Sequence, residues 1–259
     1  MARPGERRLQ MREPPLLVIM TKAPVCGAVN TRLAKDVGAV AAAALARTLT
    51  ATLLRDVARD QRFRTILATS PDHARHAHFV AWNVTYRHPG TAARAASGVA
   101  KSGDDVHHSK RLRTSASALS GVRIAAGKRQ RICQGRGGLG QRMQRIFDCC
   151  GRGPLIIVGT DIPFITREII AEAFCQLRRA DAVFGCAEDG GYWLVGLRRR
   201  PKRLAPFENV RWSSPHALAD TLKNLCSHRI AFAATLFDID TEADYRRYLR
   251  TRNAALGTG

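Results

Sequence analysis

The chain has 259 residues, 45% of them hydrophobic, which is enough to bury the core of one large α/β domain or two small ones. Its formal charge of +21, from 42 basic and 21 acidic residues, attracts polyanions such as nucleic acid, anionic membranes or phosphorylated small molecules. Seven cysteines without a Cys-x-x-Cys pair argue against both a disulfide framework and a zinc site.

Strands and helices are expected to alternate along the chain after a basic tail at residues 1–13. Short apolar runs predict strands at 16–21, 65–69, 81–87, within 154–161, and at 182–187, 192–197 and 230–236. Helical spacing and capping residues predict helices at 40–57, 139–150, 166–178, 214–226 and from 241 onward. This alternation predicts a three-layer α/β/α domain with a mainly parallel sheet, whose ligands bind at the carboxyl ends of the strands.

No apolar run suggests a membrane segment. The run at 16–20 is too short for the core of a signal peptide, and no later run reaches membrane-spanning length. Together with cysteines that are most simply reduced thiols, this favours a cytoplasmic protein.

One domain is expected at 14–250, with a C-terminal tail at 251–259 and a flexible insertion at about 90–131, rich in Ala, Ser, Gly, Lys and Arg. Between Gly90 and Cys133 there are nine basic residues and two acids, a balance of 9 − 2 = +7. No aromatic residue in that stretch can stack on bases, which disfavours specific nucleic-acid binding and favours a solvated loop.

A phosphate-binding loop is one interpretation of "TKAPVCGAVNTRLAKDVG", directly after the first strand. Lys22, Gly27, Thr31 and Arg32 lie in a strand–loop–helix context in which backbone amides and basic side chains can hold phosphate. The Gly-Lys-Ser/Thr element of a P-loop is missing. An ordinary turn with solvated charges remains the alternative.

Two further motifs place carboxylates after strands. In "VGTDIPFIT", Asp161 follows the most apolar strand and suits Mg²⁺ or Mn²⁺ held mainly through water and substrate phosphates, unless it only caps the turn. In "FDIDTEAD" we expect Asp238 and Asp240 to face opposite sides, and we choose Asp240 as the second metal contact. Asp244 is more simply a helix-capping acid.

The stretch "AEDGGYWLVGL" raises the question of why two acids and two glycines precede a strand. Glu188 and Asp189 are candidate catalytic acids, Gly190 and Gly191 would allow a ligand near the backbone, and Tyr192 or its neighbour Trp193 could stack on a sugar or a base. A glycine hairpin with exposed acids is the alternative.

A glycine-rich stretch, "QGRGGLGQRM", precedes a helix. Its glycines permit close backbone approach to a ligand, and Gln134 and Arg142 are candidate nucleotide or phosphate contacts. Taken alone, this stretch indicates little.

In this order, the motifs resemble small bacterial GT-A-type glycosyltransferases known as radical-SAM/selenodomain-associated transferases, formerly a domain of unknown function. The resemblance is carried by residues 22–33, 134–143, 159–163, 188–196, 212–213 and 238–244. It implies the nucleotide-diphospho-sugar transferase fold, which is Rossmann-like. It also implies Asp161 and Asp240 at a metal, Glu188 or Asp189 orienting or deprotonating an acceptor, and Trp212 on the acceptor or sugar side.

The implied reaction is transfer of a sugar from a nucleotide-diphosphate sugar to a small-molecule acceptor. Two residues depart from the family pattern, Asn30 in place of Lys and Gly138 in place of Asp. The alternatives are a nucleotidyltransferase that joins a nucleoside triphosphate to a phosphorylated small molecule, an inactive nucleotide-binding descendant, and a basic protein that binds anions or RNA. The sequence does not indicate an oligomeric state.

Overall fold

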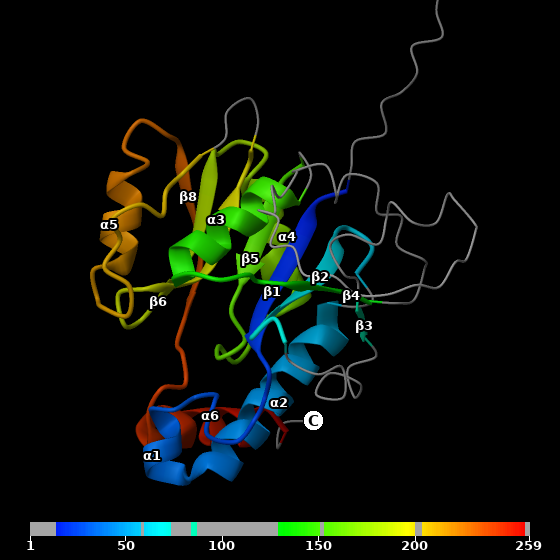
Figure 1. Cartoon of the computed structure of the whole chain (residues 1–259), viewed down its shortest axis with the longest axis vertical. Coiled ribbons are helices and arrows are strands. Elements are labelled where there is room, and N and C mark those ends of the chain that lie inside the picture. Colours follow the sequence, from blue (N-terminus) through cyan, green and yellow to red (C-terminus); the bar gives the residue numbers. More distant parts are fainter. Residues whose placement is uncertain are drawn as a thin grey trace, which may run out of the picture.

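The computed structural model describes residues 14–57, 60–73, 84–86, 129–150, 153–199 and 204–256, and its centre is one eight-stranded sheet (Figure 1). The spatial order of the strands is β3-β4-β2-β1-β5-β7-β6-β8. Every neighbouring pair is parallel except the two made by β7. The strands are β1 (Leu16–Lys22), β2 (Arg64–Ser70), β3 (Val84–Tyr86), β4 (Arg129–Cys133), β5 (Leu155–Val158), β6 (Ala182–Ala187), β7 (Tyr192–Leu197) and β8 (Ile230–Leu236).

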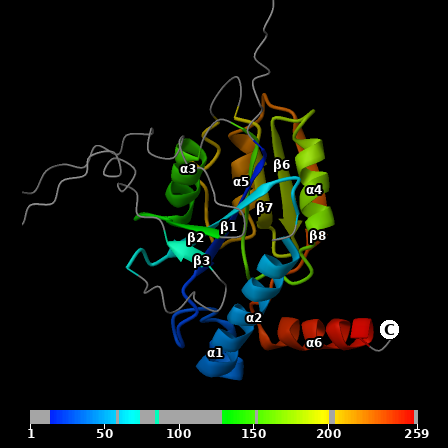
Figure 2. The ribbon, with the colours of Figure 1, turned by 90° about the vertical axis from the view of Figure 1, so that its right-hand side faces the viewer.

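Helices cover both faces of the sheet. Figure 2 shows α3 and α4 on opposite faces, with α1, α2 and α6 together at the lower end. The helices are α1 (Leu33–Val37), α2 (Ala39–Val57), α3 (Leu139–Cys149), α4 (Arg167–Gln176), α5 (Ala217–Lys223) and α6 (Glu242–Leu256). The predicted three-layer α/β/α arrangement with a mainly parallel sheet is confirmed.

Side chains of the central strands point alternately to the two faces of the sheet, and a hydrophobic core forms on each face. In β1, Leu17 and Ile19 join the cluster that includes α4, whereas Val18 joins the cluster that includes α3. Both sets are fully buried, so a central strand needs apolar residues at every position. This explains why the middle strands read as continuous apolar runs.

The parallel strands end at one edge of the sheet, which we call the carboxyl edge. Lys22 at the end of β1 pairs with Ser70 at the end of β2, and the residues after β4 and β5 emerge nearby. The antiparallel strand β7 begins at this edge, since its Tyr192 pairs with Cys186 near the end of β6. The sequence motifs with polar residues therefore converge here.

Several boundaries differ from the sequence expectations. Strand β4 has no counterpart among the predicted strands, and it shows that the insertion placed at 90–131 ends before Arg129. Its remainder, like the tail at 1–13, lies outside the described residues. Helix α6 continues to Leu256, so most of the expected C-terminal tail is helical, and α5 is shorter than the helix expected at 214–226.

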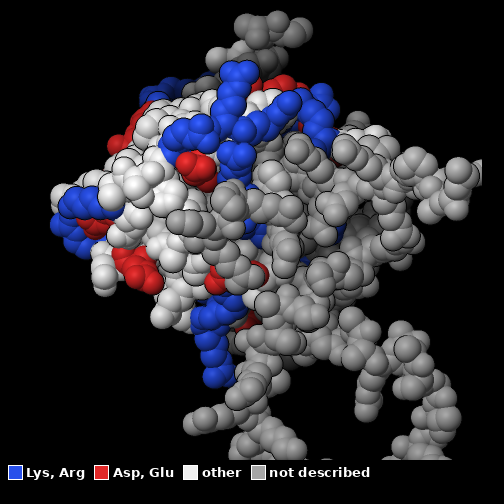
Figure 3. Space-filling view, turned by 90° about the horizontal axis from the view of Figure 1, so that it is seen from above, with Lys and Arg blue, Asp and Glu red and all other residues white. Residues whose placement is uncertain are grey.

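The opposite end of the molecule is basic. Figure 3 looks onto this end and shows Lys and Arg side chains gathered over part of it. Arg178, Arg179 and Arg229 are exposed around Asp181, where β6 and β8 begin. Within the described ranges, no helix is both long enough and apolar enough to cross a membrane.

Candidate functional site

A pocket of about 190 Å³ opens at the carboxyl edge. One side is formed by residues that follow β5, β6 and β8, and the other by the segment leading into α5. We call it the carboxylate pocket because three aspartates line it. Its lining residues are Gly159, Asp161, Ile162, Ala187, Asp189, Gly191, Tyr192, Trp193, Trp212, Ser213, Ser214, Ala217 and Asp238.

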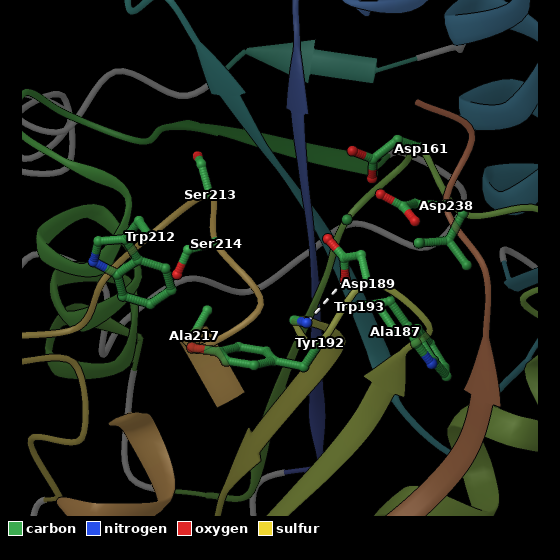
Figure 4. A pocket seen from close by; sticks show the side chains of 13 residues that line it. Asp161, Ala187, Asp189, Tyr192, Trp193, Trp212, Ser213, Ser214, Ala217 and Asp238 are labelled. Atoms are coloured by element: carbon green, nitrogen blue, oxygen red, sulfur yellow. Dashed lines mark hydrogen bonds between the residues drawn. The ribbon is translucent and has the colours of Figure 1, made fainter. Parts of the chain in front are cut away.

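The three aspartates come from three different elements. Figure 4 shows the carboxylates of Asp161, Asp189 and Asp238 directed into the same space, across from Trp212 and Ser213. The Asp189 carboxylate is oriented by the backbone N–H of Gly191, which donates a hydrogen bond of 2.8 Å to its Oδ1. The turn between β6 and β7 therefore fixes one wall of the pocket.

Burial, with added repulsion between like charges, raises two pKa values in the pocket. The Asp161 side chain reaches solvent, yet protein packed around the carboxylate raises its pKa, and the charges of Asp240 and Asp189 add to this. The nearby ammonium of Lys22 opposes the shift. The pKa of Asp238 is raised to about 6, first by burial and then by repulsion from Asp189 and Asp240. The pocket therefore holds negative charge that its own walls do not neutralise.

The turn before β7 explains one of the paired glycines. Gly190 has φ of 86°, and a Cβ there would collide with the backbone oxygen of Pro215. Its carbonyl also accepts a hydrogen bond from the N–H of Leu218. Gly190 thus packs the turn against the start of α5 and lies outside the pocket lining, while Gly191 lines the pocket.

Aromatic side chains form the opposite wall. Trp212 contacts the rings of Tyr192 and Phe207, with centroids 6.2 Å apart in both cases. A Cβ on Gly140 of α3 would lie 2.8 Å from the Trp212 ring, so this glycine makes room for the indole. The glycines of "QGRGGLGQRM" are predicted to let a ligand approach the backbone, but Gly140 instead makes room for the Trp212 side chain. The hydroxyl of Tyr192 hydrogen-bonds Thr221, which turns its polar end away from the pocket.

The structure places Glu188 outside the pocket lining. Its two carboxylate oxygens accept hydrogen bonds of 2.7 and 3.0 Å from the guanidinium of Arg247 on α6. This pairing lowers the pKa of Glu188, and Arg247 also stacks over the ring of Phe237 at 4.0 Å. Of the two candidate catalytic acids, only Asp189 faces the pocket.

The choice of Asp240 as the residue facing the site is corrected by the structure, because Asp238 lines the pocket instead. Asp240 pairs with Arg32, although its charge still acts on Asp161. The expectation that these two acids face opposite sides has no basis in strand geometry, because residues two apart in a strand share a face. Moreover, β8 ends at Leu236, before either acid. Asp244 caps α6 as expected, accepting a hydrogen bond from the N–H of Thr241.

The first loop brings basic groups to the same edge. Lys22 is exposed at the end of β1, and Gly27 has φ of 78° in open space, where a Cβ would meet nothing within 4 Å. Thr31 and Arg32 are exposed before α1, which has only five residues, so the expected helix N-terminus offers little to an anion. Arg32 is held by Asp240.

The side chain of Gln134 is held by hydrogen bonds to other parts of the protein. Its buried amide donates to the carbonyl oxygens of Thr21 and Ala68 at 3.0 and 2.9 Å, and its Oε1 accepts from Arg142. Arg145 donates to its backbone oxygen. These bonds use both N–H groups of the buried amide, so Gln134 positions Arg142 rather than presenting a donor to a ligand.

Both departures from the family pattern fit the backbone. Asn30 has φ of 44°, a conformation that asparagine tolerates better than most residues. A Cβ at Gly138 would meet nothing within 4 Å, so the aspartate of the pattern would have space there. Neither Asn30 nor Gly138 is among the residues that line the carboxylate pocket.

The pocket suits a hard divalent cation in part. Within the described segments, no three His, Cys, Asp or Glu side chains are grouped closely enough to hold a metal ion together. Mg²⁺, however, commonly uses one or two carboxylates, with water and substrate phosphates completing its shell. Asp161 and Asp238, whose pKa values are raised by burial and by neighbouring acids, have the oxygen ligands for this.

Comparison with known proteins identifies the family. Residues 53–214 match the family described as "Uncharacterized protein conserved in bacteria (DUF2064)". The chain belongs to this family. Among curated proteins, none matches the chain.

One solved structure agrees with the fold. This chain is similar to a protein of Desulfovibrio desulfuricans G20 that is provisionally described as a nucleotide-diphospho-sugar transferase. The TM-score is 0.65 at 23% identity, over 88% of this chain and 83% of that one. A weaker match, 4-diphosphocytidyl-2C-methyl-D-erythritol synthase from Anaerococcus prevotii DSM 20548, has a TM-score of 0.49 at 10% identity, covering 92% and 99%. The predicted nucleotide-diphospho-sugar transferase fold is confirmed.

Sequence reasoning missed residues whose roles depend on distant partners. Arg247 lies 59 residues from Glu188, and no local pattern links them. Ser213 and Ser214 line the pocket, although neither serine is among the predicted site residues and only Ser213 belongs to a recognised motif, with Trp212. A signal was available for Asp238, since it shares the "FDIDT" motif with Asp240.

Proposed function

We propose that this protein is a metal-dependent glycosyltransferase that moves a sugar from a nucleotide-diphosphate sugar to a small-molecule acceptor. One observation carries the proposal: the carboxylate pocket lies beside the basic first loop at the carboxyl edge of a nucleotide-diphospho-sugar transferase fold. Ligands of open α/β sheets bind at this edge. An acidic pocket next to basic groups suits a substrate with a hydroxyl-rich end and a diphosphate end.

The residues divide into two groups by charge. Lys22 and Arg32 would hold the diphosphate, Arg32 by exchanging its Asp240 partner for phosphate oxygens. Asp161 and Asp238 would hold the cation, which when bound stabilises the negative charge that develops on the departing diphosphate. This division leaves Asp189 for the acceptor.

Asp189 is placed to act on an acceptor hydroxyl. Its Oδ1 is held by the Gly191 N–H, and its carboxylate faces the pocket (Figure 4). A carboxylate fixed in this way orients a hydroxyl group and can accept its proton as the new bond to the sugar forms. The Trp212 wall would pack against the apolar face of a sugar ring.

A thermal-shift screen tests the proposal. UDP, GDP, CDP, ADP and the matching triphosphates would each be added with and without Mn²⁺ to the wild type and to Asp161→Asn. The matched control is Glu172→Gln, which also removes one acid, from an exposed position on α4. We expect one diphosphate to stabilise the wild type and the control only when Mn²⁺ is present, and to have no effect on Asp161→Asn.

Other outcomes would change the assignment. Stabilisation by a triphosphate alone would instead indicate a nucleotidyltransferase. The absence of any metal-dependent shift would contradict both activities and favour an inactive descendant.

A further inference from the structure

We propose that the carboxylate pocket selects a neutral or amine-bearing sugar ring and rejects a ring that carries a carboxylate. The inference rests on the proposed function, because it assigns a substrate class to the same site. It concerns the ring alone, so it can be tested without nucleotide or metal.

The walls of the carboxylate pocket offer hydrogen-bond acceptors and serine hydroxyl groups. Asp161, Asp189 and Asp238 face the space, and Ser213 lies across from them (Figure 4). Among the described residues that line the pocket, none is Lys, Arg or His. In the metal-free protein a ligand carboxylate here would meet three like charges, with the nearby cation Lys22 outside the lining, whereas hydroxyl or ammonium groups would find partners.

Arginines near the pocket are engaged elsewhere. Arg211 immediately precedes Trp212, but its guanidinium donates hydrogen bonds of 2.8 and 2.9 Å to the carboxylate of Asp220 on α5. That pairing lowers the pKa of Asp220 strongly. Arg247 is held by Glu188 in the same bidentate manner. Neither guanidinium is therefore available to balance a carboxylate in the pocket.

The dimensions and surfaces suit a single ring. The pocket, with a volume of about 190 Å³, has room for a small polar ring at the carboxyl edge. Trp212 and Tyr192 provide the apolar wall, and Gly159 and Gly191 add no side chain to the lining. An aromatic wall facing carboxylates matches a pyranose, which has C–H groups on its faces and hydroxyl groups around its rim.

The charge pattern also sets the direction in which a substrate lies. A diphosphate would lie at the Lys22 and Arg32 side of the pocket, where the cation that Asp161 and Asp238 would hold offsets their repulsion. The ring then points inward from the phosphates. Selection by charge would therefore act on the ring rather than on the nucleotide.

Saturation-transfer NMR with free sugars tests the inference. Glucosamine, glucose and glucuronate have the same ring and differ in charge, and each would be titrated at neutral pH with a chelator present. For the wild type we expect glucosamine to bind at least about tenfold more tightly than glucuronate, with glucose between them. For Asp189→Asn we expect this ratio to fall, because one of the three repelling charges is removed.

The control variant Glu172→Gln should keep the wild-type ratio. Equal or tighter binding of glucuronate, or no binding of any of the three sugars, would overturn the inference. If only this inference fails, the sugars do not bind in the expected order but the metal-dependent thermal shift with a nucleotide is still seen. If the proposed function fails, that thermal shift is absent, whatever the sugar titration shows.

Discussion

The carboxyl edge of the sheet has two halves of opposite charge. On the side of β1, β2 and β4 it presents Lys22 and Arg32, with Arg142 fixed by Gln134. On the side of β5, β7 and β6 it presents the carboxylate pocket. In a chain of net charge +21, acids without a basic partner in the pocket wall are the feature that requires explanation. The division favours a substrate with one anionic and one hydroxyl-rich end.

The two halves also differ in how they are built. The acidic half uses the ends of strands and a turn closed by hydrogen bonds from Ala187 N–H to the Gly191 carbonyl and from Gly191 N–H to the Asp189 carboxylate. The basic half uses long side chains on a loop, and Arg32 is already paired with Asp240. We therefore expect the acidic half to be preformed and the basic half to change partners when a diphosphate binds.

The largest expected effect comes from a glycine in the acidic half. Gly190→Ala combines a left-handed backbone with a Cβ that collides with Pro215 and should lower the free energy of unfolding by about 2–5 kcal/mol. Gly27→Ala in the basic half has the left-handed backbone but open space, and should cost about 1–2 kcal/mol. Urea unfolding of both variants measures the difference. Equal losses would show that the turn does not pack against α5.

A smaller effect is expected from Asp238. Its pKa is about 6 in the folded protein, against an ordinary value of 3.8. Between these pH values the folded state therefore binds more protons than the unfolded state. The free energy of unfolding falls as the pH rises through this range. Asp238→Asn should remove this fall and gain on the order of 2 kcal/mol at neutral pH without metal. Unfolding curves at pH values from about 4 to 7 would show it, and parallel pH profiles for wild type and variant would contradict it.

How far the sequence could predict this structure depends on whether the signal is local. The apolar runs predict β6 and β7 with their observed bounds, because strands inside the sheet need apolar residues on both faces. The bounds of β8 are also predicted correctly, although it is an edge strand with half-buried and exposed residues. Strand β4 has the polar sequence "RQRIC" and is a strand because β2 and β3 pair with it. No local pattern contains those partners.

The same distinction holds for the site. Asp161 and Asp189 are predicted correctly at the carboxyl edge because they follow strands directly. Gln134, predicted as a phosphate contact, and Glu188, predicted as a catalytic acid, are instead paired with protein groups. These partners, the carbonyls of Thr21 and Ala68 and the guanidinium of Arg247, come from distant segments. Residue type and spacing identify where polar groups gather, whereas side-chain pairing decides which of them remain available.

Arg32 tests whether the basic half changes partners. Arg32→Gln should weaken the binding of inorganic pyrophosphate about tenfold, or about 1.4 kcal/mol, while the melting temperature moves little because the ion pair is exposed. Asp240→Asn should strengthen binding in the absence of metal, because it releases Arg32. Calorimetric titration measures both.

The matched control for Arg32 is Arg246→Gln, which breaks another exposed ion pair, with Glu242 on α6. It should leave pyrophosphate affinity nearly unchanged. Weaker binding in Asp240→Asn would contradict the exchange of partners and indicate that Asp240 acts on the ligand directly.

The smallest structural effect is expected at Glu188, and it separates the two neighbouring acids. Glu188→Gln loses an exposed ion pair with Arg247 and should lower the melting temperature by at most about 2 °C. Because Glu188 lies outside the pocket lining, sugar transfer by this variant should stay within about twofold of the wild-type kcat/KM. Asp189→Asn should be equally well folded but lose at least about a hundredfold, as expected when a general base is removed. If Glu188→Gln lost activity to the same extent while remaining folded, the acid that acts on the acceptor would be Glu188, released from Arg247 when substrate binds.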